Sequence, residues 1–290
     1  MSRRTTSWRL LVHPPADGAW NMAVDEAILE SYLGRSPDLR QPTLRLYSWG
    51  PPTLSLGKSQ IAEDAHDGDF LRRRRIDLVR RPTGGLAVLH ENERTYSVIG
   101  SLRREPFDAG VLETYRLIAR ALEKALRTFG LDARASASGR SRPGSEERGP
   151  ACFALTSDHE ITVEGRKLIG SAQLRRGRAF LQHGSIPLQT DAERLAGALG
   201  HDVAAESFTG LRCELGREID PCELDRALCE AFESCFGITL EPGSLSSREE
   251  LRAAQLGCWK HDSLSWTLGG RLGVRERRWG PLGSDLTPAR

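Results

Sequence analysis

Two extended segments joined by a tight turn, within residues 160–184, constrain the fold of this chain most strongly. Polar and apolar side chains alternate along residues 160–164, which is the pattern of a strand buried on one face. Gly165 follows at the position of a turn, and the apolar residues 168 and 169 return the chain to the sheet. This stretch therefore predicts a hairpin within a larger sheet.

The predicted hairpin would carry Lys167 back toward the segment that begins near Cys152. An ammonium group stabilises a thiolate more than a neutral thiol, so a cysteine beside a lysine is a candidate nucleophile with a lowered pKa. Two simpler interpretations stand beside this one: Cys152 as a small core residue, and Lys167 as a solvated charge. We expect Lys167 to lie exposed in the turn and to contribute little to stability.

Hydrophobic periodicity predicts helices and strands along the rest of the chain. The predicted helices cover residues 18–33, 61–75, 108–129, 190–199, 220–237 and 246–256. The other predicted strands cover residues 44–49, 53–57, 76–81, 86–89 and 95–99. Pro51 and Pro52 separate the first two of these strands, which we expect to pair as a hairpin. After residue 256 we expect a small ribbon or a loose tail.

Residues 133–150 have almost no apolar side chains and are rich in Ser, Gly, Arg and Pro. This composition predicts a mobile loop. Because the loop directly precedes Cys152, it could serve as a lid over an active site or be a passive surface insertion.

Composition argues against several classes of protein. With 41 basic and 39 acidic residues, the net charge of +2 gives no sign of a nucleic-acid partner. No apolar run approaches the roughly 20 residues that cross a bilayer, and the N-terminus lacks a hydrophobic signal core, so we expect a cytoplasmic protein without a membrane partner. The six cysteines form no C-x-x-C pair, which argues against zinc, and we expect Cys229 and Cys235 to be buried helix thiols.

A glycine pair, Gly84 and Gly85, would let the backbone approach a ligand closely because neither residue has a Cβ. His90 ends the strand predicted directly after the pair. Alone, such a pair is more often a simple turn and such a histidine a structural hydrogen-bonding group. The motifs that surround them decide between these interpretations.

Four motifs in a fixed order carry a family resemblance. They are DGAWNMAVDE at residues 17–26, YSWGPPTLSLGKSQ at 47–60, RRPTGGLAVLH at 80–90 and EGRKLIGSAQ at 164–173. Together they resemble the lipoate-protein ligase A and octanoyltransferase superfamily. The resemblance implies an α/β fold in which a mixed sheet is packed with helices, as in biotin and lipoate protein ligases. It also implies a catalytic domain over residues 1–250, with a helix and short tail at 251–290 packed on it.

The sequence around Cys152 is similar to the LipM type of octanoyltransferase, in which a cysteine carries the acyl group. The similarity implies that Cys152 and Lys167, fifteen residues apart, are the catalytic pair. The residues that it implies for substrate binding are Arg81, Thr83, Gly84, Gly85, His90, Gly170, Ser171 and Ala172.

The resemblance implies transfer of an octanoyl group from octanoyl-acyl carrier protein to a lipoyl-domain lysine, such as that of the glycine cleavage H protein. Such an enzyme needs no cofactor and no metal, and we expect a monomer. Three alternatives stay open from the sequence: an ATP-dependent lipoate ligase, a LipL-type amidotransferase, and a non-catalytic protein that binds acyl groups or lipoyl domains.

Overall fold

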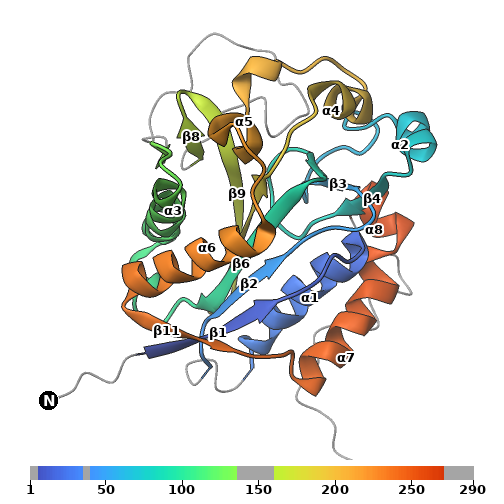
Figure 1. The fold of residues 1–290 in the computed structure, drawn as a ribbon. Helices are drawn as coiled ribbons and strands as arrows, with labels where there is room; N and C mark the ends of the chain where they lie inside the picture. The colour runs from blue at the N-terminus through green and yellow to red at the C-terminus, as the bar shows by residue number, and fades with distance from the viewer. Residues whose placement is uncertain (1–5, 35–39, 136–159, 271–290) are drawn as a thin grey trace, which may run out of the picture.

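The computed structural model describes residues 6–34, 40–135 and 160–270 (Figure 1). An eight-stranded sheet forms its centre. In spatial order the strands are β11 (Ile238–Pro242), β1 (Thr6–Val12), β2 (Thr43–Tyr47), β6 (Glu93–Ser101), β10 (Ala179–Pro187), β9 (Arg166–Arg176), β8 (Ile161–Val163) and β7 (Arg134–Ala135). β1 runs parallel to β11 and β2, and the other neighbours are antiparallel. The mixed sheet confirms the expected fold class.

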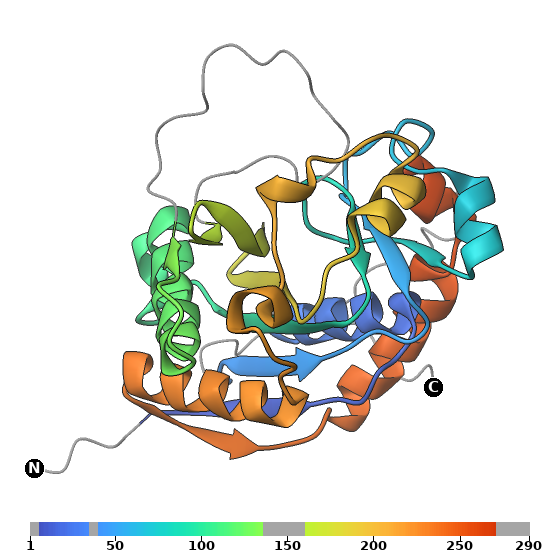
Figure 2. The same cartoon turned by 45° about the horizontal axis from the view of Figure 1, so that its top comes forward.

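Helices cover both faces of the large sheet (Figures 1 and 2). They are α3 (Val111–Thr128) and α6 (Pro221–Phe236) on one face, and α1 (Gly18–Ser31) with α7 (Ser247–Leu256) packed on it on the other. Side chains alternate between the faces, as the period of two in a strand requires. Val98 packs in the core with α3 and α6, whereas its neighbour Ile99 packs in the core with α1. Coverage on both faces explains why β6 is buried along its whole length.

A smaller sheet of three strands carries a second core. Its strands, in order, are β4 (Asp77–Arg80), β3 (Thr53–Leu56) and β5 (Val88–His90), and α2 (Gly68–Arg74) and α4 (Ala192–Leu199) pack with it. The expected hairpin between residues 44–49 and 53–57 is wrong, because β2 pairs with β1 and β6 while β3 pairs with β4 and β5. Each strand is wholly buried and has a partner at both edges. The chain therefore crosses between sheets at Pro51 and Pro52.

Capping residues set the starts of several helices. The side chains of Asp17, Asp220 and Ser246 each accept a hydrogen bond from a backbone N–H in the first turn of α1, α6 and α7. These starts were expected from the sequence. The helix expected over residues 61–75 is wrong in its first half, because Asp67 caps α2 by accepting from the Phe70 amide at 2.9 Å.

The cysteines of α6 correct another expectation. Cys235 is exposed and Cys229 is half-buried, so neither is the fully buried thiol that the helical pattern predicted. The last turn of α6 directs Phe236 onto Trp8, with ring centroids 4.7 Å apart, and leaves Cys235 outside the core.

Residues 257–270 are helical and form no ribbon, and the rest of the expected tail lies outside the described residues. The helical segment forms a π-helical turn (Gly257–His261) and then α8 (Leu264–Gly269). Trp266 of α8 is buried, and its indole N–H donates to the Arg80 carbonyl at 2.9 Å. The Arg80 guanidinium donates in return to the carbonyls of Trp266, Thr267 and Leu268, the last turn of α8. These bonds fasten the segment to β4.

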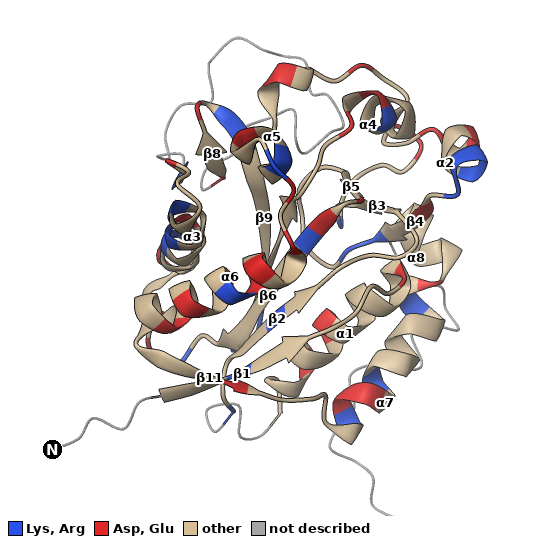
Figure 3. Ribbon diagram, viewed as in Figure 1, with Lys and Arg blue, Asp and Glu red and all other residues tan. Residues whose placement is uncertain are grey.

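Acidic and basic residues are interspersed over the described ribbon (Figure 3). The exposed arginines at residues 72–75, at the end of α2, are a local exception. In the part of the chain that the structure describes, no helix is both long and apolar enough to cross a membrane.

Candidate acyl-binding site

A pocket opens where the small sheet meets strands β6, β9 and β10 of the large one. Its cavity volume is about 80 Å³, smaller than that of most ligand pockets. The residues expected to bind substrate that line it are Arg81, Gly85, His90, Gly170, Ser171 and Ala172. The other lining residues are Met22, Tyr47, Trp49, Ser55, Val88, Thr95, His183, Gly184 and Ser185. The fold thus brings motifs that are far apart in the sequence to one cavity.

Exposure falls steeply from one end of this pocket to the other. Gly85 and the adjacent Gly84 are exposed, whereas Met22 of α1 and Tyr47 of β2 are buried. The glycine pair therefore marks the mouth, and α1 and β2 close the floor. A floor with a thioether and an aromatic ring suits the end of an apolar chain.

The loop at the mouth is held closely by its neighbours. Arg81 donates from Nη2 to the carbonyls of Gly84 at 2.8 Å and Leu86 at 2.7 Å. Gly57 packs directly beneath, where a Cβ would lie 1.8 Å from the Gly85 carbonyl oxygen. No side chain fits between these two backbones, so Gly57 sets the position of the mouth.

Gly57→Ala is expected to displace the Gly84–Gly85 loop and weaken binding of octanoate at least tenfold. The added methyl would overlap a backbone carbonyl, and overpacking of this kind typically costs about 1–3 kcal/mol. Titration of the tryptophan fluorescence measures the affinity, because Trp49 lines the pocket. Gly269→Ala is the matched control, since a Cβ at that glycine would meet nothing within 4 Å. Equal affinity of wild type and Gly57→Ala would show that the loop does not set the pocket.

Two predicted binding residues, Thr83 and Gly84, do not line the pocket itself. Thr83 is fully buried, and its hydroxyl lies 2.7 Å from Nε2 of His183. Nδ1 of His183 lies 3.1 Å from Oδ2 of Asp25. Because the Asp25 carboxylate accepts, we assign the proton of the neutral imidazole to Nδ1, and the Thr83 hydroxyl donates to Nε2. Thr83 thus ties the mouth loop to β10 and α1.

Asp25 is the buried centre of this network. Its carboxylate accepts from Arg45 at 2.7 Å, Tyr47 at 3.0 Å and Ser97 at 3.0 Å, in addition to His183. Burial alone would raise the pKa of Asp25, but the charge of Arg45 and the bond from His183 outweigh it and hold the pKa at about 2. Burial is also the main cause that lowers the pKa of His183. An ionised carboxylate and a neutral imidazole therefore underlie this wall of the pocket.

His90 lines the same pocket from β5. Its ring stacks on Trp49, with centroids 3.9 Å apart and planes 12° apart. The Trp49 indole N–H donates to the Thr95 hydroxyl at 2.7 Å. These contacts fix the orientation of the imidazole at the cavity.

Lys167 is buried, so the expectation that it would lie exposed in the turn is wrong. Its side chain is 1% exposed, and its ammonium donates to the buried carboxylate of Glu160. The turn ends at Gly165 and β9 begins one residue before Lys167, so Lys167 belongs to the sheet. A Cβ on Gly170 would lie 3.3 Å from the Lys167 Nζ. Because Gly170 lines the pocket, the ammonium lies directly behind the pocket wall.

Cys152 and residues 136–150 of the expected loop lie outside the described residues. The approach of Cys152 to Lys167 therefore stays a prediction. Within the described ranges, no three His, Cys, Asp or Glu side chains gather where they could hold a metal ion.

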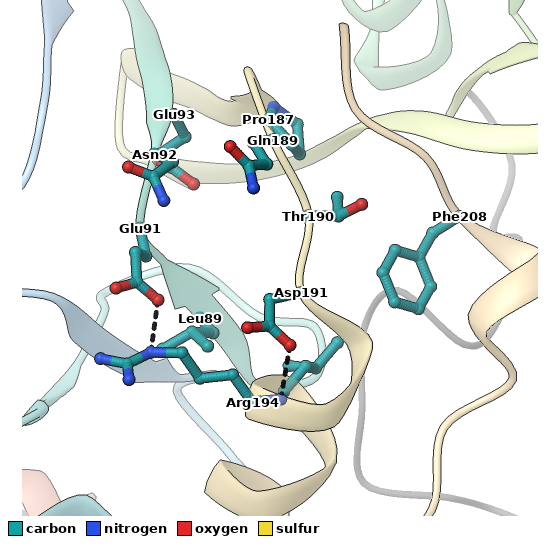
Figure 4. Close-up of a pocket in the computed structure, with 11 residues that line it drawn as sticks. Leu89, Glu91, Asn92, Glu93, Pro187, Gln189, Thr190, Asp191, Arg194 and Phe208 are labelled. Atoms are coloured by element: carbon teal, nitrogen blue, oxygen red, sulfur yellow. Dashed lines mark hydrogen bonds and ion pairs between the residues drawn. The ribbon is translucent and has the colours of Figure 1, made fainter. Parts of the chain in front are cut away.

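Figure 4 shows the residues that line a second pocket. Arg194 of α4 forms an ion pair with Glu91 at 2.5 Å across one end, and Phe208 faces the cavity from another segment. Glu93 lines this second pocket, while its carboxylate accepts from residues that line the first. Glu93 therefore separates the two cavities. Among the described residues, no predicted site residue lines the second pocket.

The sequence does not predict several residues that line the first pocket, among them Met22, Tyr47, Ser55 and His183, nor Glu93 behind His90. His183 and Ser185 share a face of β10, so period-two alternation next to a histidine is the signal available for this pair.

The comparisons with known proteins confirm the family resemblance. The family model of the lipoyl protein ligase A/B catalytic domain matches residues 17–233. An octanoyltransferase LipM of Kyrpidia tusciae is 41% identical over 264 residues, covering 86% of this chain and 94% of that protein. A solved lipoate-protein ligase A bound with ATP is 26% identical, with a TM-score of 0.77 over 91% of this chain and 100% of that one.

A third relative is an archaeal protein. The bipartite lipoate protein ligase of Thermoplasma acidophilum, from a structural study that includes its E2 lipoyl domain, is 25% identical, with a TM-score of 0.74 over 93% of this chain and 99% of that one. The family model spans every residue named above as lining the first pocket. The chain belongs to the lipoyl protein ligase A/B catalytic domain family.

Proposed function

We propose that this chain is an octanoyltransferase that forms a protein-bound octanoyl amide through a cysteine thioester. One observation carries the proposal: the Lys167 ammonium lies directly behind the wall of a pocket with an apolar floor. Similarity to octanoyltransferases named LipM, over most of the chain, supports this choice among the activities of the family.

In the proposed first step, the thiolate of Cys152 attacks the carbonyl of an octanoyl thioester. The new C–S bond replaces the bond to the donor sulfur, and the donor leaves as a thiolate that takes up a proton. In the second step a lysine amine of the acceptor attacks the Cys152 thioester, loses a proton, and releases the Cys152 thiolate. Thioester exchange is nearly isoenergetic and amide formation from a thioester is downhill, so no nucleotide is needed.

Lys167 has two roles in this proposal. Its cation favours the thiolate of Cys152, and its N–H groups stabilise the oxyanion that forms on the acyl carbonyl in both steps. One such donor is commonly worth about 3 kcal/mol of transition-state stabilisation. The position of Nζ beside Gly170 supports a contact with the carboxyl end of the acyl chain. Arg81, Thr83, Gly84, Gly85 and His90 shape the cavity that holds the chain.

We assign octanoyl-acyl carrier protein as the donor and an apo lipoyl domain, such as that of the glycine cleavage H protein, as the acceptor. A carrier thioester supplies the activated acyl group that the proposed chemistry requires. The archaeal relative that was studied with its E2 lipoyl domain supports an acceptor of this class. We propose that a monomer is sufficient for the reaction.

Incubation of the protein with apo lipoyl domain and octanoyl carrier protein alone is expected to yield octanoylated acceptor. A parallel incubation with free octanoate, ATP and magnesium is expected to yield none, because the proposed route begins from a thioester. Intact mass of the lipoyl domain measures both reactions. Product only in the second reaction would make the chain an ATP-dependent ligase. Product in neither would favour a non-catalytic binding protein.

A further inference from the structure

A serine, a histidine and a glutamate line up at the wall of the acyl pocket. Nε2 of His90 lies 2.8 Å from Oγ of Ser55, and Nδ1 of His90 lies 2.9 Å from Oε1 of Glu93. Ser55 and His90 both line the cavity, and Glu93 stands behind the imidazole. This is the order of contacts by which a carboxylate orients a histidine and the histidine activates a hydroxyl nucleophile.

The hydrogen bonds around Glu93 determine where the protons lie. The carboxylate accepts from the hydroxyls of Thr95 and Ser185 as well as from His90. Burial raises the pKa of Glu93, but the electrostatic attraction of His90 and these hydrogen bonds outweigh burial and keep the pKa below its usual value. An ionised carboxylate can only accept, so in the neutral form of His90 the proton lies on Nδ1 and Nε2 accepts. The Ser55 hydroxyl therefore donates to His90.

A cation also touches the serine oxygen. Arg81 donates from Nη1 to Oγ of Ser55 at 3.1 Å and to the Ser55 carbonyl at 3.0 Å. The same guanidinium donates to the Gly84 carbonyl in the exposed loop at the mouth. The Arg81 guanidinium thus links Ser55 to the loop at the mouth of the pocket. A negative charge that develops on the Ser55 oxygen would face this positive charge.

The second histidine of the pocket provides an internal comparison. His183 has the same pattern of contacts, with Asp25 at Nδ1 and the Thr83 hydroxyl at Nε2. Both hydroxyl residues are 0% exposed, but Ser55 lines the cavity and Thr83 does not. Of these two networks, the one with Ser55 therefore places its hydroxyl at the cavity.

We propose that Ser55, His90 and Glu93 form a second nucleophilic centre, which hydrolyses acyl esters and thioesters of medium chain length bound in the pocket. Ser55 Oγ attacks the acyl carbonyl while its proton passes to Nε2 of His90, and the departing alcohol or thiol takes that proton. Water then attacks the acyl-serine ester, its proton passes to Nε2, and Ser55 Oγ regains it. The products are the free fatty acid and the alcohol or thiol. Only the choice of acyl chain rests on the proposed transferase function.

The test uses the full chain carrying Cys152→Ala, so that the proposed transfer nucleophile is absent. This variant is expected to hydrolyse 4-nitrophenyl octanoate and to be labelled by an alkyl fluorophosphonate on the peptide that contains Ser55. Adding Ser55→Ala is expected to lower the hydrolysis rate at least 100-fold and to abolish the label. Ser247→Ala, which removes an exposed hydroxyl on α7, is the matched control and is expected to change neither.

Glu93→Gln separates a catalytic role of the network from a structural one. An amide at this position donates to Nδ1 of His90 and leaves Nε2 protonated, so the imidazole can no longer accept the serine proton. We expect at least a tenfold loss of hydrolysis and a displaced midpoint of the pH profile of hydrolysis. The melting temperature, recorded in parallel, shows whether the variant has also lost stability.

Two results would overturn the proposal. One is hydrolysis or labelling that is equal in the Cys152→Ala protein with and without Ser55, and the other is a label that maps to another residue. If the variant with Ser55→Ala fails to fold, the residue labelled in the Cys152→Ala protein, which keeps Ser55, decides whether Ser55 is the nucleophile. Failure of octanoyl transfer in the intact enzyme would leave this outcome unchanged, because the assay excludes Cys152.

Discussion

Lys167→Met is expected to lower the free energy of unfolding by about 3 kcal/mol or more. The variant removes the cation from a pair in which Lys167 is 1% exposed and Glu160 is 2% exposed, and leaves a carboxylate in the interior. Breaking a buried ion pair by removing one partner typically costs about 3–5 kcal/mol, far more than the loss of an exposed pair. Urea denaturation followed by circular dichroism measures the change.

The double variant Lys167→Met with Glu160→Gln is the control for this prediction. Removing both charges takes away the unpaired carboxylate, so stability is expected to recover by at least half of the loss. Octanoyl transfer is expected to stay below one hundredth of the wild-type rate, because no cation then lies behind Gly170. An unfolding midpoint of Lys167→Met that equals the wild-type value would mean that Glu160 does not depend on this lysine.

Cys152→Ala is expected to reduce octanoyl transfer at least 1000-fold while the melting temperature stays within a few degrees of the wild-type value. Nucleophilic catalysis divides one difficult step into two easier ones, and without the thiol neither step is available. The rate of acceptor modification at saturating octanoyl carrier protein measures the loss. Transfer at the wild-type rate would exclude Cys152 as the acyl carrier and leave the family fold without the proposed route.

Local patterns predicted much of the fold. The strands around Gly165 and the starts of the helices expected at residues 18 and 220 depend on residues close in sequence, and the structure confirms them. The partner of each strand depends on the whole chain instead. Nothing near Pro51 indicates that the strand before it joins the large sheet and the strand after it the small one.

The same distinction explains the outcome for the site. The motifs identified the residues at the mouth, because glycine pairs and a nearby histidine are visible along the chain. The burial of Lys167 depends on Glu160, which lies across a hairpin, and on how the adjoining segments cover that hairpin. Likewise, Ser55 reaches His90 only because β3 and β5 pair antiparallel. Spacing along the sequence does not encode such contacts.

Mass spectrometry of the protein after brief exposure to octanoyl carrier protein, without acceptor or ATP, tests the central claim most directly. The account predicts the gain of one octanoyl group on the peptide that contains Cys152. It also predicts that hydroxylamine removes the group, as expected for a thioester, and that addition of apo lipoyl domain transfers it to the acceptor lysine. An unmodified Cys152 peptide, in a preparation that nevertheless octanoylates the acceptor, would contradict the account.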